Sequence, residues 1–288
     1  MSVLKAIAKG MGTTLRKPRL VVILYVFNLV FAVAAAAPFL LLVHQELGHS
    51  LAGSNVRPAD VTWLGEAALK YGNALMPLLG LVLTVGFLYL ALQVFFNGGV
   101  VGRLLDREGR TTLEPFFADC GRYFWRYVRI FLISLIFLFL TFGVLLKLLS
   151  ALIRPASESA VTEWLPLILS NLHFLVALLL LSIVHMIVDY ARIAVVADGE
   201  AKVLRALRHA LKFLGKRFFR AWAIYLLLVL LTLAGTIVFY AVLGRFAAPA
   251  VAGVVAGLAW MQIYVLFRIW MRTVFVSAQA EYYRSHPY

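Results

Sequence analysis

The sequence predicts an all-α, polytopic membrane protein with six transmembrane helices. Of its 288 residues, 63% are hydrophobic and 14% are charged, whereas a soluble domain has about 45–50% apolar and about 25% charged residues. The single cysteine excludes a disulfide-stapled secreted domain. No apolar run shows the period-two alternation of a membrane β-barrel. Six runs reach the length of about 20 residues that a spanning helix needs, and they cover 20–43, 72–97, 129–152, 164–191, 221–244 and 248–276.

The first apolar run has two interpretations. A basic segment precedes it, and the small residues Ala34 to Ala37 resemble a signal-peptide cleavage site. However, the run continues to Val43 and is long enough to span a bilayer. We therefore expect an uncleaved first transmembrane helix.

The distribution of charge predicts the orientation of the spans. Placing each connecting segment on alternate sides puts 22 of the 27 Lys and Arg on the side of the termini, and that side carries the whole net charge of +14. The positive-inside rule makes this side cytoplasmic, with both termini inside. The excess of basic residues is thus a topology signal, and we expect no specific nucleic-acid partner.

Three similar segments precede the first, third and fifth spans. Val3–Ile7 aligns with Val203–Leu207 at an offset of 200 residues, and Leu113 and Arg126 align with Leu204 and Arg217 at an offset of 91. Two spans follow each segment, so the copies keep the same orientation. The single membrane domain, 1–288, is therefore predicted to contain parallel repeats that favour pseudo-threefold packing, with units at about 1–98, 110–192 and 200–280. Similar composition of unrelated interfacial helices is the alternative.

Each repeated segment has the periodicity of an amphipathic helix. Apolar residues recur at alternating spacings of three and four, which is typical of a helix lying at a membrane surface. The third segment is the most basic, with seven Lys or Arg between Lys202 and Arg220. Such a helix is expected to set the depth of the protein in the membrane, to gather anionic lipids or to dock a partner. Its predicted interfacial basic residues are Arg205, Arg208, Lys212, Lys216, Arg217 and Arg220.

The run Leu204 to Trp222, LRALRHALKFLGKRFFRAW, followed by an aliphatic span, carries a family resemblance. It resembles bacterial six-helix integral membrane proteins of unknown function. The layout is also similar to the membrane domain of bacterial glycerophosphodiester phosphodiesterases. The resemblance implies a multi-pass protein of the bacterial inner membrane. The soluble phosphodiesterase domain has no counterpart here, so neither its activity nor its site residues carry over.

Polar residues gather at one end of the even-numbered spans. His185, Asp189 and Arg192 share one helix face, as do Arg268 and Arg272. Charges within a span cost about 2.5–3.5 kcal/mol near its centre by insertion scales, so they tend to face a partner or a wet cavity. If the spans converge, three arginines and one acid leave an excess of two positive charges. The predicted anion- or lipid-binding residues are Arg192, Arg268, Arg272, His185, Asp189, Gln93 and Asn97.

The alternative is that these arginines reach out to lipid headgroups while Asp189 pairs locally with Arg192. Other chemistry is sparse. His44 and His49 in HQELGHS are five residues apart, whereas the zinc-protease motif needs two His at i and i+4. Asn97-Gly98-Gly99 is interpreted as a helix stop, and Cys120 as a packing residue. No catalytic residue, metal site or cofactor is predicted.

The function favoured by these patterns is nonenzymatic. The protein is expected to bind or transport an anionic lipid, or another anionic amphiphile, at the cytoplasmic leaflet. The alternative is a structural or assembly subunit of a larger membrane protein complex, which would need a membrane protein partner. An intramembrane enzyme is the third and least favoured class.

Overall fold

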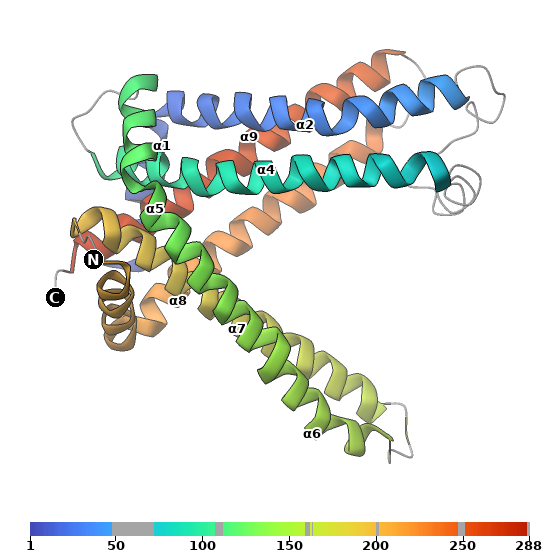
Figure 1. Ribbon diagram of the computed structural model, residues 1–288. Helices are drawn as coiled ribbons and strands as arrows, with labels where there is room; N and C mark the ends of the chain where they lie inside the picture. Colours follow the sequence, from blue (N-terminus) through green and yellow to red (C-terminus); the bar gives the residue numbers. More distant parts are fainter. Residues whose placement is uncertain are drawn as a thin grey trace. The chain divides into compact units, whose positions relative to one another are not determined.

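In the part of the chain that it describes, the computed structural model contains six helices that are long and apolar enough to cross a membrane (Figure 1). Among the described residues there is no β-strand. The predicted all-α, polytopic fold is therefore confirmed for that part of the chain. The structure describes residues 1–47, 72–106, 112–158, 162, 164–199, 202–246 and 251–286.

The helices contain the predicted apolar runs and extend beyond most of them. The last predicted run is 248–276, and its first three residues, 248–250, lie outside the described residues. In chain order the elements are α1 (Val3–Leu15), α2 (Pro18–Leu47), α4 (Gly72–Leu105), α5 (Leu113–Leu138), a π-helix (Phe139–Leu145), α6 (Leu146–Glu158), α7 (Trp164–Ala197), α8 (Val203–Leu243), a 3₁₀ turn (Gly244–Phe246) and α9 (Val251–Arg284).

The chain forms two compact units. One comprises Val22–Gln93, and the other comprises Met1–Val21 together with Val94–Tyr288. In the first unit, α2 and α4 are joined by a hydrogen bond that the Tyr89 hydroxyl donates to Asn28 Oδ1, and the Tyr89 ring lies 5.6 Å from that of Phe31. In the second unit, α5 and α6 pack along α7, and α8 packs along α9. The single membrane domain stays a prediction.

The helix stop predicted at Asn97-Gly98-Gly99 is wrong, because α4 continues to Leu105. Glycine at these positions serves close packing. A Cβ built on Gly99 would lie 2.5 Å from Cys120 Sγ and 2.8 Å from the carbonyl oxygen of Phe116. The missing side chains thus let the end of α4 lie directly against α5, as small residues do at membrane helix interfaces.

The three segments predicted as interfacial helices differ in how they join their spans. The first is a separate helix, α1, whose first turn is capped by Ser2 Oγ accepting from the Lys5 amide. The second runs without a break into its span as α5. The third also continues into its span, but the backbone of Arg217 leaves helical geometry within α8. Of the three predicted segments, only α1 is a separate helix, and their position at a membrane surface stays a prediction.

At the start of α1 and of α8 a small residue faces the protein while a large apolar neighbour does not. Ala6 and Ala206 are fully buried, whereas Leu4 and Leu204 are 73% and 72% exposed. Gly10 lies so close to α9 that a Cβ on it would come within 2.7 Å of the Ala278 backbone. Leu4 and Leu204 of the sequence pattern are therefore available to a membrane surface, whereas Leu214 of the same pattern is buried.

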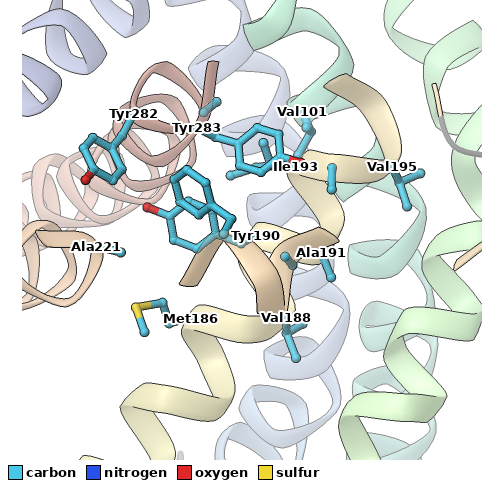
Figure 2. Close-up of a cluster of buried hydrophobic side chains, with 14 of the residues drawn as sticks. Val101, Met186, Val188, Tyr190, Ala191, Ile193, Val195, Ala221, Tyr282 and Tyr283 are labelled. Atoms are coloured by element: carbon cyan, nitrogen blue, oxygen red, sulfur yellow. The ribbon is translucent and has the colours of Figure 1, made fainter. Parts of the chain in front are cut away.

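Most burial is concentrated where helix ends meet in the second unit. We call this region the basal core. It is rich in aromatic residues, and Figure 2 shows Tyr190, Tyr282 and Tyr283 gathered between α7 and α9. The basal core comprises 1–15, 94–105, 113–130, 182–197, 203–228 and 269–283.

Candidate anion site in the basal core

The Asp189 side chain is the centre of a polar cluster that joins α4, α7 and α9. Its Oδ1 lies 3.5 Å from Arg192 Nη1, one turn along α7, and its Oδ2 lies 3.5 Å from Gln279 Nε2 on α9. Arg192 and Asp189 are each about a quarter exposed. Both contacts are at the outer limit for a hydrogen bond, so the carboxylate is held loosely.

The α9 arginine nearest this carboxylate is anchored to α4. Arg272 Nη2 donates to Asn97 Oδ1 at 3.0 Å, and Arg272 also acts electrostatically on Asp189. The ends of α4, α7 and α9 therefore converge, which was the condition for the predicted charge excess. We call this group, defined by Asn97, Asp189, Arg192, Arg272 and Gln279, the Asp189 cluster.

Of the remaining predicted site residues, His185 and Arg268 lie on the same helices as cluster residues. His185 is exposed, its Nδ1 lies 2.9 Å from the Leu181 carbonyl oxygen, and it acts electrostatically on Asp189. Arg268 is exposed one turn before Arg272, with its guanidinium 6.0 Å from the Tyr264 ring. Gln93 belongs to the other compact unit. The structure thus brings together Asn97, Asp189, Arg192 and Arg272.

Gln279 was missed by the sequence analysis because the predicted sixth span ends at 276. The segment beyond it stays helical to Arg284 and is buried among other helices. Within the described ranges, several polar atoms of α7 and α9 are buried without a hydrogen-bond partner, and these are Tyr190 Oη, Arg192 Nε, Trp270 Nε1, Ser277 Oγ, Gln279 Oε1 and Tyr282 Oη.

A second ionic cluster lies where α1 ends and α4 meets α5. Arg103 Nη2 lies 2.5 Å from Asp119 Oδ2, and Arg103 Nη1 lies 3.1 Å from Asp106. The Lys17 ammonium donates to the carbonyl oxygens of Arg103 and Asp106 at the end of α4. Burial, the largest effect, lowers the pKa of Lys17, while the nearby Asp106 carboxylate opposes it. We call these four residues the Arg103 cluster.

The basic segment of α8 presents most of its charges outward. Five of its six predicted residues are exposed, and Arg217 alone is half-buried. Asp198, between α7 and α8, links the start of α8 to α9. Its Oδ2 accepts a hydrogen bond from the Tyr283 hydroxyl of α9 at 2.7 Å and lies 3.4 Å from His209 Nδ1 of α8. An open surface depression lies at the break in α8, and it is lined by Lys216, Arg217, Phe218, Phe219 and Arg220.

The other sequence candidates are placed as follows. Cys120 is fully buried against Gly99, as a packing residue would be. His44 lies in α2, and His49 lies outside the described residues. Within the described ranges, no group of three His, Cys, Asp or Glu side chains is arranged to hold a metal ion.

Comparisons with protein families, with curated proteins and with solved structures find no match for this chain. The resemblance to bacterial six-helix proteins stays a prediction.

Proposed function

We propose that this protein binds or transports an anionic lipid, or another anionic amphiphile, at the cytoplasmic leaflet of the bacterial inner membrane, without catalysing a reaction. The observation that carries the proposal is the charge of the Asp189 cluster. Arg192 and Arg272 oppose one carboxylate, so arginines outnumber acids in the cluster by one. Arg268, one turn before Arg272 on α9, adds a second positive charge at the end of these membrane-spanning helices, and this excess favours an anion.

The chemistry of arginine identifies the class of ligand. The planar guanidinium group matches the oxygens of phosphate and carboxylate, and paired contacts of this kind are stronger than neutral hydrogen bonds. The long contacts from Asp189 to Arg192 and Gln279 mean that an incoming anion displaces only weak interactions. Arg192 Nε is buried and has no hydrogen-bond partner among the described residues, so it is a further donor.

An amphiphile is favoured over a small soluble anion because the cluster adjoins lipid-facing helices. In the most apolar window of each span, at most 17% of residues are buried within the chain. Apolar surface of this extent is covered by lipid tails, so a headgroup at the Asp189 cluster has an acyl environment beside it. The cytoplasmic placement follows from the charge asymmetry of the sequence.

The same exposed spans favour the second candidate, an assembly subunit whose helices pack against another membrane protein. The predicted parallel repeat fits either function, because three similar hairpins would make a scaffold. Two backbone breaks support the repeat. The chain leaves helical geometry at Lys17, between α1 and α2, and at Arg217, which aligns with Lys17 at the offset of 200 residues.

Native mass spectrometry with lipid identification tests the proposal on gently extracted protein. We expect the wild type to retain an anionic lipid that is lost from an Arg192→Ala, Arg268→Ala, Arg272→Ala variant. Arg122→Ala, at an exposed position on α5, is the matched control and should keep it. A stoichiometric heteromeric mass would favour the assembly role, and a lipid-free wild-type monomer would contradict lipid binding.

A further inference from the structure

The start of α8 has one face against the protein and one face outside it. The residues that pack into the basal core are Val203, Ala206, Ala210, Phe213 and Leu214. The outer face is basic, and its exposed cations are Arg205, Arg208, Lys212 and Lys216. No acidic residue occurs between Lys202 and Arg220. Among the described residues, none of the exposed cations forms an ion pair, so the charge of this face is uncompensated there.

The outer face also has an apolar edge. Leu204 and Leu211 are seven residues apart, so they lie on nearly the same side of the helix, and they are 72% and 44% exposed. Arg208 lies beside this pair, and Lys212 and Lys216 follow it at spacings of four, which turns the row of cations gradually away from the leucines. Charged and apolar strips therefore run next to each other, as in a helix that lies among lipid headgroups.

The rest of α8 indicates where this face meets the membrane. Phe219 follows the kink at Arg217 by two residues and is 80% exposed. Tyr240, also exposed, comes 21 residues later, which is about 32 Å along a helix. The hydrocarbon core is about 30 Å thick, and exposed aromatic side chains gather at its two boundaries. A span bounded by these two rings would place residues 203–216 level with the headgroups.

The apolar edge distinguishes a lipid surface from an acidic protein as the partner. Either partner would match the cations by charge. Leu204 and Leu211, however, need an apolar environment, and acyl chains supply one at the membrane boundary. An anionic leaflet thus accounts for both strips of the face at once.

We propose that the outer face of residues 203–216 docks on the anionic surface of the cytoplasmic leaflet. Leu204 and Leu211 enter the acyl region, and Arg208, Lys212 and Lys216 contact lipid phosphates. The face thereby gathers anionic lipids around the protein. It is separate from the Asp189 cluster and does not depend on the function proposed for that cluster.

Spin labels on the full chain, in vesicles of phosphatidylcholine with a minor share of phosphatidylglycerol, test the orientation of the face. Cys120 is fully buried, so labels attach at Leu211→Cys or at Arg205→Cys. We expect the label at position 211 to collide more with oxygen, which concentrates among acyl chains, than with a water-soluble nickel chelate. The label at position 205 should show the reverse. Greater access of the chelate at position 211 would place the face in water and overturn the proposal.

Spin-labelled phosphatidylglycerol and phosphatidylcholine test the lipid selectivity in the same vesicles. We expect the wild type to associate preferentially with phosphatidylglycerol. The variant Arg208→Gln, Lys212→Gln, Lys216→Gln should lower this preference about twofold or more, whereas Arg208→Lys, Lys212→Arg, Lys216→Arg should keep it. High salt should weaken the preference as well.

Two further variants separate this face from other cations. Lys147→Gln removes an exposed charge on α6 and is the matched control, and Arg192→Ala alters only the Asp189 cluster. Both should keep the wild-type preference, so a failure of lipid binding at the Asp189 cluster can be told apart from a failure here. Equal preference in the wild type and the triple Gln variant, or an equal loss in Lys147→Gln, would contradict docking by this face.

Discussion

The Asp189 cluster lies in the basal core and the Arg103 cluster lies at its edge, and the two clusters are built differently. In the Arg103 cluster two cations face two acids, and the closest pair is 2.5 Å apart with each side chain only 12% exposed. In the Asp189 cluster the contacts of the carboxylate are 3.5 Å long and arginines outnumber acids. Charge balance and short distances indicate a structural role, whereas surplus charge and long distances leave room for a ligand.

Removing one partner of the Arg103 cluster should have the largest effect on stability. Asp119→Asn removes the negative charge that lies closest to Arg103, at a site where both side chains are mostly buried. Breaking a buried ion pair costs about 3–5 kcal/mol in stability. We expect a fall toward the lower end of that range, because Asp106 still contacts Arg103. Thermal unfolding in detergent measures it. A variant as stable as the wild type would show that this cluster is not structural.

The contact between α4 and α5 should rank second. Gly99→Ala introduces a Cβ 2.5 Å from Cys120 Sγ and 2.8 Å from a backbone oxygen, and overpacking of this kind costs about 1–3 kcal/mol. Gly121→Ala on α5 is the matched control, since a Cβ there meets nothing within 4 Å. In an exposed helix this change normally stabilises by about 1 kcal/mol or less. The two substitutions should therefore shift the melting temperature in opposite directions, and equal shifts would refute the packing role of Gly99.

A smaller effect is expected at the link between α9 and the start of α8. Tyr283→Phe removes the hydroxyl that donates to Asp198 Oδ2 at 2.7 Å and keeps the ring packed against Phe213, 5.0 Å away. A hydrogen bond to a charged group contributes about 1.5–3 kcal/mol, and partial exposure of Asp198 lowers this to about 1 kcal/mol. Chemical unfolding curves of the two proteins measure the difference. A change above that of Asp119→Asn would reverse the ranking of the two regions.

The fold was predictable where one physical constraint dominates. Apolar runs of about 20 residues have few alternatives to a spanning helix, and all six candidate spans are helical in their described parts. Glycine is more ambiguous, because the sequence Asn97-Gly98-Gly99 fits a helix stop as well as a close contact between helices. The position of Cys120 on α5, directly against Gly99, shows that these glycines serve a helix contact.

The Asp189 cluster was predictable in part. Helical spacing placed Asp189 and Arg192 on one face, and the structure places them in contact. Gln279 could not be found in this way because its role depends on where α9 ends and what buries it. The unpartnered hydroxyl of Tyr282 is likewise a property of packing, which residue spacing does not encode.

Opposite substitutions within the Asp189 cluster test the central claim most directly. Asp189→Asn removes the carboxylate that competes with the anion, and Arg192→Ala removes a side chain that binds it. For each variant we would measure the dissociation constant of one short-chain anionic lipid in zwitterionic nanodiscs. We predict tighter binding for Asp189→Asn and weaker binding for Arg192→Ala, each by about tenfold, which corresponds to about 1.4 kcal/mol. Unchanged affinity in both variants, or a loss in both, would contradict an anion site at Asp189.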